Sequence, residues 1–288
     1  MSLSDRVPST ISTNLFVPSI YSNKVIEAAK TTLVNADAVN TEWLSDAAKG
    51  QIFYLPKTNT VTATEVVVGT KGSALNPLNT TGVTVTMNQW YEAPVDIDYM
   101  SKFQSQTEAE DFCKAESAYA IDVAIDTYIS SLYSSLGGYS TSAYGSDGQD
   151  LDDNLLIYLM ETLDENNAPR DGGRSLILDP SAMADMIKID KFVASMYVQI
   201  GAVQNGLIGS NHPIYGCNVR VTNNLTAASI GNYCVMLHKN AIAAKVQIHN
   251  AWILEYKDLH ETRVQVEALW GASEAQDAFG VPFFSRKA

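Results

Sequence analysis

The sequence predicts a mixed α+β fold in which elongated segments precede a compact α/β region. Residues 51–97 repeatedly alternate apolar and polar side chains, which is the two-residue period of β-strands. Residues 107–136 carry apolar side chains at steps of three and four, the period of a long amphipathic helix. Beyond residue 150, short helical and strand patterns follow one another between turn residues. Together these patterns predict the α+β class.

Composition limits the class of protein. With 288 residues, 46% of them hydrophobic, the chain can bury a substantial core. Thirty-two Asp and Glu against 19 Lys and Arg give a formal net charge of −13, which disfavours attraction of the whole molecule to nucleic acid. No segment has the roughly 18 consecutive apolar residues that span a bilayer, and the first residues lack a secretory signal pattern. We therefore expect a globular protein that is neither secreted nor embedded in a membrane.

The cysteines indicate a reducing compartment. Cys113, Cys217 and Cys234 are odd in number, widely separated and without Cys-x-x-Cys spacing. This arrangement favours free thiols over a disulfide framework or a zinc site. We expect the compartment to be the cytoplasm.

The N-terminal residues are expected to form an extended arm. Residues 1–20 combine two prolines with Ser, Thr and Asn, a composition that suits an arm whose partners lie elsewhere. Residues 21–34 place apolar side chains on one helical face after Ser22, a suitable N-cap. A second short helix is predicted around residues 42–49, ending at Gly50.

A long β-hairpin is predicted after the arm. Residues 51–55 read as a strand closed by Pro56, and residues 60–64 and 83–87 alternate as strands do. Turn residues fill the interval, and the tip is expected to contain Gly69, Lys71, Gly72 and Pro77. An isolated hairpin is marginal in water. Something outside this segment, or outside the chain, is therefore expected to support it.

The long helix has the clearest start among the predicted elements. Thr107 and Glu110 are spaced as a capping box, with acidic residues in the first turn. The helix is expected to run to Gly137 and Gly138, a length of about 45 Å at 1.5 Å per residue. Its predicted apolar stripe consists of Ile121, Ile125, Tyr128, Leu132 and Leu136.

The compact region is predicted to alternate helices and strands. One helix, capped by Asp150 or Asp152, ends before Pro169, and a second begins at Asp179 and Pro180. The apolar residues of the two helices are Leu155, Leu156, Leu159, Leu163, Met183, Met186 and Ile187. The loop that follows contains Gly201, Gly206 and Gly209. Strands are predicted at residues 174–178, 217–222, 233–237 and within 244–270, where residues 264–268 alternate strictly.

Two pairs of carboxylates could bind a metal ion but have simpler interpretations. Asp96 and Asp98 could hold a divalent cation, although they fit better as two acids on one face of a strand. Asp122 and Asp126 lie one helical turn apart and off the predicted stripe. No Glu-x-x-His companion accompanies them, which favours a solvated or subunit-facing side of the helix. No metal site is therefore predicted.

No catalytic or cofactor-binding motif is present. The histidines lack zinc-site spacing and are interpreted as ordinary surface or core residues: His212, His238, His249 and His260. The glycines of residues 201–209 match neither a dinucleotide fingerprint nor a phosphate loop. No Gly-x-Ser-x-Gly elbow occurs, and Cys113 is the one cysteine with a neighbouring basic residue, Lys114. The sequence predicts no catalysis and no cofactor.

The order of the predicted elements resembles that of the major capsid proteins of tailed bacteriophages, the Hong Kong 97-like fold, over essentially the whole chain. Several segments are similar to recurring segments of that family. They are residues 21–25 (YSNKV), 50–56 (GQIFYLP), 89–97 (QWYEAPVDI), 174–182 (RSLILDPSA), 206–209 (GLIG), 215–219 (YGCNV) and 236–243 (MLHKNAIA). Their joint order and spacing carry the resemblance.

The resemblance implies a division of the chain. It implies an N-terminal arm in residues 1–50, an extended hairpin loop with flanking strands in 51–97, and a peripheral domain with the spine helix in 98–142. It further implies an axial domain in 143–243 and C-terminal strands in 244–288 that return to both domains. In that fold the hairpin lies across a neighbouring subunit, and the axial domain, with its glycine-containing loop, points toward the symmetry axes.

The resemblance also implies a function without catalysis. A major capsid protein self-assembles into the pentamers and hexamers of an icosahedral phage head that encloses double-stranded DNA. The net charge of −13 suits a wall that encloses DNA without binding it specifically. The virion capsid would be assembled in the host cytoplasm, away from any membrane. Its implied partners are other copies of the chain, a separate scaffolding protein unless a longer precursor is processed, a portal and a cement protein.

Lys71 has a possible role by resemblance. Some family members join the hairpin to a neighbour through a bond between lysine and asparagine, and Lys71 lies near the predicted tip. The sequence names no acid that would activate it, so a solvated turn lysine is the favoured interpretation.

Two other functions are kept as alternatives. A bacterial nanocompartment shell has the same fold and would enclose cargo enzymes in place of DNA. An acidic, metal-dependent cytoplasmic enzyme would use Asp96 and Asp98 and would act as a monomer or small oligomer. Particle size separates the shells from the enzyme.

Overall fold

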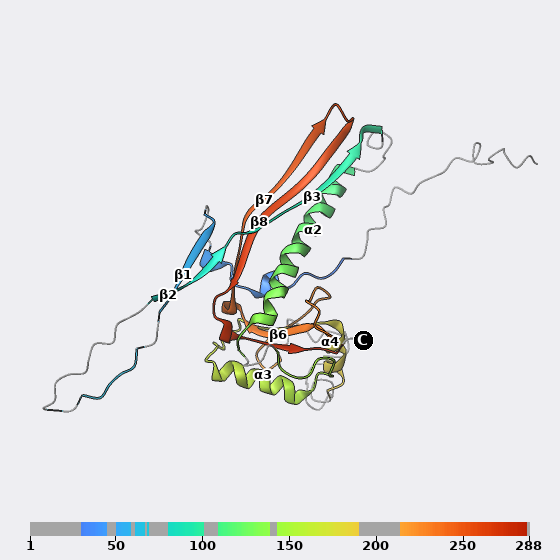
Figure 1. Ribbon diagram of the computed structural model, residues 1–288. Coiled ribbons are helices and arrows are strands. Elements are labelled where there is room, and N and C mark those ends of the chain that lie inside the picture. Colours follow the sequence, from blue (N-terminus) through green and yellow to red (C-terminus); the bar gives the residue numbers. More distant parts are fainter. Residues whose placement is uncertain are drawn as a thin grey trace, which may run out of the picture.

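The computed structural model describes residues 30–44, 50–58, 61–66, 68, 80–100, 109–138, 143–189 and 214–286. These residues form three separate β-sheets and three α-helices, which confirms the α+β class. An elongated part, made of a three-stranded sheet and one long helix, rises from a compact part, and a two-stranded hairpin projects to the side (Figure 1).

The hairpin consists of β1 (Ile52–Thr58) and β2 (Thr80–Thr86), which pair antiparallel from Ile52 opposite Thr86 to Thr58 opposite Thr80. The expectation that Pro56 closes the first strand is wrong. In a two-stranded sheet every strand has a free edge, where the missing N–H of proline is tolerated. The strand predicted over residues 60–64 is also wrong, because residues 61–66 have no regular structure. The alternation of apolar and polar residues does not produce a buried face in this segment, because Val61 and Val66 are both exposed.

The elongated part is a sheet of β3 (Gln89–Asp98), β8 (Glu261–Glu274) and β7 (Ile242–Tyr256), antiparallel throughout with β8 in the centre. Helix α2 (Ala109–Ser131) packs along β8 and β3 (Figure 1) and continues as a 3-10 helix (Leu132–Ser135). The predicted alternation in β8 is confirmed, because every second residue from Val264 to Trp270 is buried. Thr107, the predicted cap of the helix, lies outside the described residues.

The buried side of α2 differs from the predicted stripe. Its fully buried apolar positions, continued through the 3-10 turn, are Ile121, Ile125, Ile129, Tyr133 and Leu136. The prediction is wrong for Tyr128 and Leu132, which are only partly buried. The second half of the helix is covered on a further side, because Asp126 and Ser130 are also buried. Asp126 accepts from Asn35 of the N-terminal segment, and Ser130 accepts from the amide of Thr226 in the compact part.

The compact part has the strand order β5 (Asn218–Val221), β4 (Arg174–Leu178), β6 (Tyr233–His238), β9 (Gly280–Phe284). β4 and β5 are parallel, and the other pairs are antiparallel. Helices α3 (Asp153–Glu165) and α4 (Pro180–Ile187) add a core of buried leucines and Met186.

Both helices of the compact part start where the sequence predicts. Asp152 caps α3 by accepting from the amide of Leu155 at 2.8 Å, which decides between the two predicted caps. Asp179 caps α4 through the amide of Ala182 at 2.7 Å. Ile187 is not a core residue as predicted, because it ends α4 and is 39% exposed. Short 3-10 helices, Lys239–Ala241 and Asp277–Phe279, precede β7 and β9.

The N-terminal segment begins, among the described residues, at Lys30 and lies between α2 and the compact part. The helix predicted over residues 21–34 is wrong for residues 30–34, which are not helical; residues 21–29 lie outside the described residues. Hydrogen bonds to other elements hold this stretch extended, including Thr31 N to the Tyr119 hydroxyl at 2.7 Å. Two 3-10 helices follow, Ala36–Ala38 and Glu42–Leu44, the second at the start of the helix predicted over 42–49. None of the helices described is long and apolar enough to cross a bilayer.

Candidate assembly surfaces

The hairpin β1–β2 has one face anchored and one face open. Phe53 and Leu55 pair with Val85 and Val83 and pack on a small cluster with Leu44, Met87, Ala243 and Ala275. Successive strand residues point to opposite faces, so Ile52 and Tyr54 lie on the other side. Their exposed fractions are 47% and 70%, and their partners are Thr86 and Thr84. The hairpin therefore presents an apolar stripe that no described residue covers.

A cleft of about 560 Å³ lies where the hairpin joins the rest of the molecule. Its lining comprises Trp43, Leu55, Pro56, Lys57, Thr58, Val83, Ala275 and Gln276. Trp43 is 42% exposed, so its ring is open to the cleft. The lining mixes apolar side chains with Lys57, Thr58 and Gln276, and it contains no acidic side chain and no histidine.

The outer face of the three-stranded sheet, away from α2, is acidic and cross-linked by polar contacts. Arg263 forms a two-pronged ion pair with Asp96, at 2.6 and 2.8 Å. This hydrogen bonding lowers the pKa of the Asp96 carboxyl. Asp96 and Asp98 lie on one strand face, which confirms the strand interpretation. The cation interpretation has no support, because Arg263 already occupies the Asp96 carboxylate.

Two carboxylates face each other on the same outer surface. Glu92 and Glu267 are directly opposite in the pairing of β3 with β8. Gln265 Nε2 donates to Glu92 at 2.7 Å, and Trp252 Nε1 donates to Glu267 at 3.0 Å. These neutral donors offset part of the repulsion between the like charges.

The far end of the β7–β8 hairpin is apolar and exposed. Trp252, Ile253 and Leu254 are consecutive in β7 and are 49%, 44% and 41% exposed. Leu259, in the turn between the two strands, is 64% exposed. Because neighbouring strand residues point to opposite faces, three consecutive large apolar residues make both faces of the strand apolar. This end is a second uncovered apolar surface.

Asp126 connects three parts of the chain. Its carboxylate accepts from the amides of Asn35 and Ala36 at 2.8 and 3.2 Å and from the side chains of Asn35 and Asn224 at 2.9 and 3.0 Å. The residue is fully buried, which contradicts the predicted solvated or subunit-facing position, whereas Asp122 is exposed as predicted. Burial raises the pKa of the Asp126 carboxyl, and the donors act in the opposite direction.

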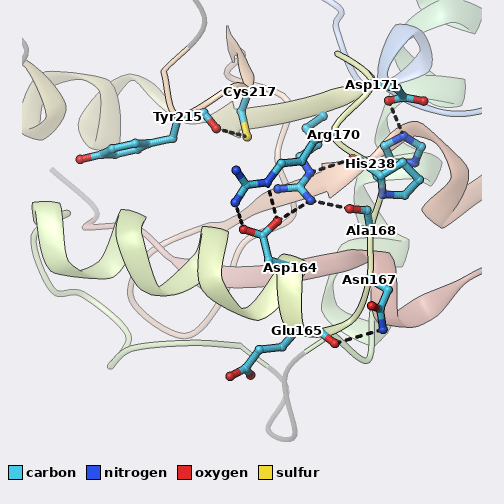
Figure 2. Close-up of polar contacts among 11 residues, drawn as sticks. Asp164, Glu165, Asn167, Ala168, Arg170, Asp171, Tyr215, Cys217 and His238 are labelled. Atoms are coloured by element: carbon cyan, nitrogen blue, oxygen red, sulfur yellow. Dashed lines mark hydrogen bonds and ion pairs between the residues drawn. The ribbon is translucent and has the colours of Figure 1, made fainter.

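A polar network fixes the loop between α3 and β4. Figure 2 shows Asp164 facing Arg170, and Asp164 also accepts from Arg174 at 2.8 Å. The side chain of Arg174 is 1% exposed and also donates to the carbonyls of Ala168 and Pro169. Arg170 and then Arg174 lower the pKa of Asp164 to about 2. The buried charge of Arg174 is therefore paired and hydrogen-bonded.

His238 belongs to the same region and is a structural residue. It is fully buried, its Nδ1 accepts from the amide of Asn240 at 3.2 Å, and its Nε2 lies 2.9 Å from Asp171 (Figure 2). These contacts assign the proton to Nε2, which donates to Asp171. The core interpretation is confirmed for His238 and the surface interpretation for the exposed His260. His212 and the side chain of His249 lie outside the described residues.

The three cysteines are free thiols, as predicted. Burial raises the pKa of Cys217 to about 11, and burial followed by the charge of Glu116 raises the pKa of Cys113. Cys234 is fully buried and its pKa is also raised. Each thiol is therefore kept protonated, in contrast to the lowered pKa of a nucleophilic cysteine.

The site residues named from the sequence are not placed by the structure. Gly69, Lys71, Gly72 and Pro77 at the hairpin tip lie outside the described residues, and so do Gly201, Gly206 and Gly209. Among the residues that are described, no group of three His, Cys, Asp or Glu side chains is arranged to hold a metal ion.

Sequence reasoning did not single out the apolar end of β7 or the role of Asp126. The first had a signal, because the run Trp252-Ile253-Leu254 breaks the alternation expected of a half-buried strand. The second had none, because the partners of Asp126 are distant in the sequence.

Solved structures of phage and related particles share this fold. A chain from Mycobacterium phage Che8 matches with a TM-score of 0.79 at 21% identity, covering 93% of this chain and 97% of that one. A chain from the capsid of the cyanophage P-SCSP1u matches with a TM-score of 0.75 at 12% identity, covering 96% and 94%. A chain from the capsid of a native GTA particle matches with a TM-score of 0.70 at 10% identity, covering 96% and 98%.

These matches extend over nearly the whole of both chains in each pair. No protein-family model and no curated protein matches the sequence. The likeness therefore lies in the fold: the chain has the Hong Kong 97-like fold that its order of elements resembles.

Proposed function

We propose that this chain is the major capsid protein of a tailed bacteriophage, which self-assembles into the pentamers and hexamers of an icosahedral head around double-stranded DNA. The observation that carries the proposal is the match over nearly the full length of both chains to a capsid chain of the cyanophage P-SCSP1u and to other capsid chains. The role is structural, and the subunit resides in the virion capsid after assembly in the host cytoplasm.

The uncovered apolar surfaces support the same proposal independently of the matches. The open face of the hairpin, with Ile52 and Tyr54, and the apolar end of β7 would be unfavourable in an isolated soluble molecule. In a closed shell, repeated contacts between copies bury such surfaces. The proposal therefore explains why two elements expose apolar side chains outside the apolar clusters that the described residues form.

Within the proposed shell, the parts of the chain have different roles. Residues 1–50 act as the arm, 51–97 as the extended hairpin loop that lies across a neighbour, and 98–142 as the peripheral domain with α2 as the spine. Residues 143–243 form the axial domain, whose loop contains Gly201, Gly206 and Gly209, and residues 244–288 return to both domains. The hairpin tip, with Gly69, Lys71, Gly72 and Pro77, contacts a neighbouring copy.

The proposed partners follow from this role. They are other copies of the chain, a separate scaffolding protein, a portal and a cement protein. DNA is enclosed without specific binding, as the net charge of −13 supports. The enzyme alternative has no observation in its favour, since Asp96 is paired with Arg263. No observation favours the nanocompartment alternative over the phage head.

Electron microscopy of the purified protein tests the proposal. Negative-stain images and light scattering are expected to show closed shells of uniform size, formed by the chain alone or after co-expression with its scaffolding protein. Small monodisperse species under every assembly condition would contradict the coat function.

A hairpin variant tests the role of the extended loop. Replacing residues 59–79 with Asn-Gly joins the paired residues Thr58 and Thr80 through a two-residue turn, which keeps the anchored base of β1 and β2 and removes the distal part. We expect a folded subunit, with the thermal unfolding transition of the parent protein, that forms no shells. Normal shells from this variant would refute the role assigned to the hairpin.

A further inference from the structure

The outer edge of β7 is covered at one end and open at the other. Near its start, Asn40 closes the edge: its amide donates to the carbonyl of Ile242, and its carbonyl accepts from the amide of Ala244, both at 3.0 Å. β7 is nevertheless the last strand of its sheet. Within the part of the chain that the structure describes, no strand or bridge pairs with the outer edge over residues 250–256, here called the free edge of β7.

Most of the free edge lacks the features that usually protect an edge strand, and Glu255 is its one charged residue. Natural edge strands carry charges, prolines or bulges that prevent pairing with another chain. The register shift of β7 lies earlier, between Val246 and Ile248, and residues 250–254 contain neither charge nor proline. Trp252, Ile253 and Leu254 are instead uncharged and exposed, and Trp252 and Ile253 have high strand propensity. Such a segment favours pairing with a further strand.

Trp252 is held in place before any partner arrives. Its indole Nε1 donates to Glu267 on β8 at 3.0 Å, while half of the side chain remains exposed. An aromatic residue that is already oriented loses little conformational freedom on binding. The free edge therefore combines an unpaired backbone with a fixed apolar anchor.

We propose that the free edge of β7 pairs antiparallel with the free edge of a second copy, about a two-fold axis at Ile253. The proposal rests on the coat function proposed above, because a shell supplies identical neighbours related by symmetry. The two three-stranded sheets would join into one six-stranded sheet across the boundary between subunits.

The sequence of the free edge supports this register. With the axis at Ile253, each Ile253 lies opposite the partner subunit's Ile253, and Trp252 lies opposite the partner subunit's Leu254. Glu255 lies opposite the partner subunit's Ala251, so no like charges meet. A register centred on Glu255 would place two carboxylates opposite each other, which is destabilising. The edge is thus complementary to itself, which identifies the occupant as a second copy.

Disulfide cross-linking of assembled particles tests the pairing. Cys113 is first replaced with Ser, since it is the one cysteine that is not buried. In this background Ile253→Cys places the two thiols opposite each other across the axis. Mild oxidation followed by non-reducing electrophoresis is expected to show covalent dimers, at a level roughly tenfold above the control variants, whose thiols lie too far apart for a disulfide.

The controls test the register as well as proximity. In Leu254→Cys the two Cα atoms would be about 8 Å apart, from about 6.6 Å along the strands and about 5 Å between them, which is too far for a disulfide. Leu259→Cys lies in the exposed turn of the same hairpin, and Ile230→Cys is an exposed isoleucine of the compact part. We expect all three to remain monomeric.

Each outcome separates this inference from the coat function. Particles in which Ile253→Cys stays monomeric would overturn the edge pairing and leave the coat function intact. Cross-linking of Leu259→Cys in its place would show that the hairpin ends meet, which also overturns the pairing. If the Cys113→Ser parent forms no particles, the proposed coat function is contradicted. In that case Ile253→Cys is oxidised as a soluble protein: covalent dimers would support the edge pairing, and monomers would overturn it.

A second pair of variants covers the case in which Ile253→Cys blocks assembly. Ala251→Cys and Glu255→Cys subunits, mixed before assembly, keep Trp252, Ile253 and Leu254 and are expected to cross-link to each other, because residue 251 lies opposite residue 255 in this register, and Glu255→Cys alone is not. Absence of these mixed dimers from assembled particles would overturn the pairing.

Discussion

The compact part and the hairpin β1–β2 use β-structure in opposite ways. All five residues of β4 are buried, with neighbours on both sides in the sheet. No residue of β1 is buried, and its one neighbour is β2. A strand that is buried on both faces is stabilised by its own chain, whereas an exposed two-stranded hairpin is marginal without external contacts. The comparison indicates which part is stabilised by its own chain and which part, under the proposed coat function, requires other copies.

The two regions also differ in how side-chain charge is handled. In the compact part the buried charge of Arg174 is paired with Asp164, and the Asp185 carboxylate accepts from Lys188 and Arg286. In the described part of the hairpin, the exposed side chains include the apolar Ile52 and Tyr54. Variants in the compact part should therefore affect the stability of the subunit, and variants in the hairpin should affect assembly.

The largest effect on stability is expected from Asp164→Asn. The change removes the charge that pairs with Arg174, whose side chain is 1% exposed, and an unpaired buried charge lowers the free energy of unfolding by about 3–5 kcal/mol. Chemical denaturation of the unassembled subunit measures the change. Glu165→Gln, the same type of change at the next, exposed position, is the control and should have little effect; equal effects of the two variants would contradict the role of the ion pair.

Asp126→Ala is expected to have the next largest effect, at about 2–3 kcal/mol. It leaves the amides of Asn35 and Ala36 and the side chain of Asn224 without their acceptor in a buried site. Hydrogen exchange should show faster exchange of the amides at residues 35 and 36, because the N-terminal segment loses its attachment to α2. Asp122→Ala, one turn away and exposed, should leave both measurements unchanged within about 0.5 kcal/mol.

The pH dependence of stability sharpens the same comparison. The arginines lower the pKa of Asp164 from its ordinary 3.8 to about 2, so the folded state favours the carboxylate. A carboxyl whose pKa is lower in the folded state than in the unfolded chain stabilises the fold at pH values above its unfolded pKa. This stabilisation is lost as the pH falls through the folded pKa, here between about pH 4 and pH 2. The difference in unfolding free energy between the parent protein and Asp164→Asn should therefore narrow over that interval. A constant difference would contradict the assignment to Asp164.

The smallest effect on the isolated subunit is expected in the hairpin. Tyr54→Ser removes a side chain that is 70% exposed, so the free energy of unfolding should change by less than about 0.5 kcal/mol. Shell formation, measured by light scattering, should decrease strongly. Val85→Ala, on the buried face of the same hairpin, is the counterpart and should destabilise the subunit by about 2 kcal/mol. If Tyr54→Ser destabilised the subunit more than Val85→Ala, the assignment of Tyr54 to the open face of the hairpin and of Val85 to its buried face would be refuted. If Tyr54→Ser left shell formation unchanged, the proposed role of the open face in assembly would be refuted.

Elements specified by nearby residues could be predicted from the sequence. Asp152 and Asp179 cap α3 and α4 through amides three residues later, and the alternation of β8 reflects one face packed on the core. These features depend on short-range geometry that periodicity and capping residues record. The class of fold and the order of the elements followed from the same signals.

Features that depend on distant residues could not be predicted. The buried position of Asp126 requires Asn35 and Asn224, which are 91 and 98 residues away in the sequence. The strand predicted over residues 60–64 had the correct alternation but no partner that buries one face. The hairpin tip and the glycine loop lie outside the described residues, so their assigned roles stay predictions.

Hydrogen exchange of assembled particles compared with unassembled subunits tests the central claim most directly. The claim is that other copies stabilise the extended elements, whereas the compact part is stable by itself. Amides of β1, β2 and residues 250–256 are expected to exchange much more slowly in particles, and amides of β4 and β6 at nearly the same rate in both states. Equal protection of the extended elements in both states would contradict the account.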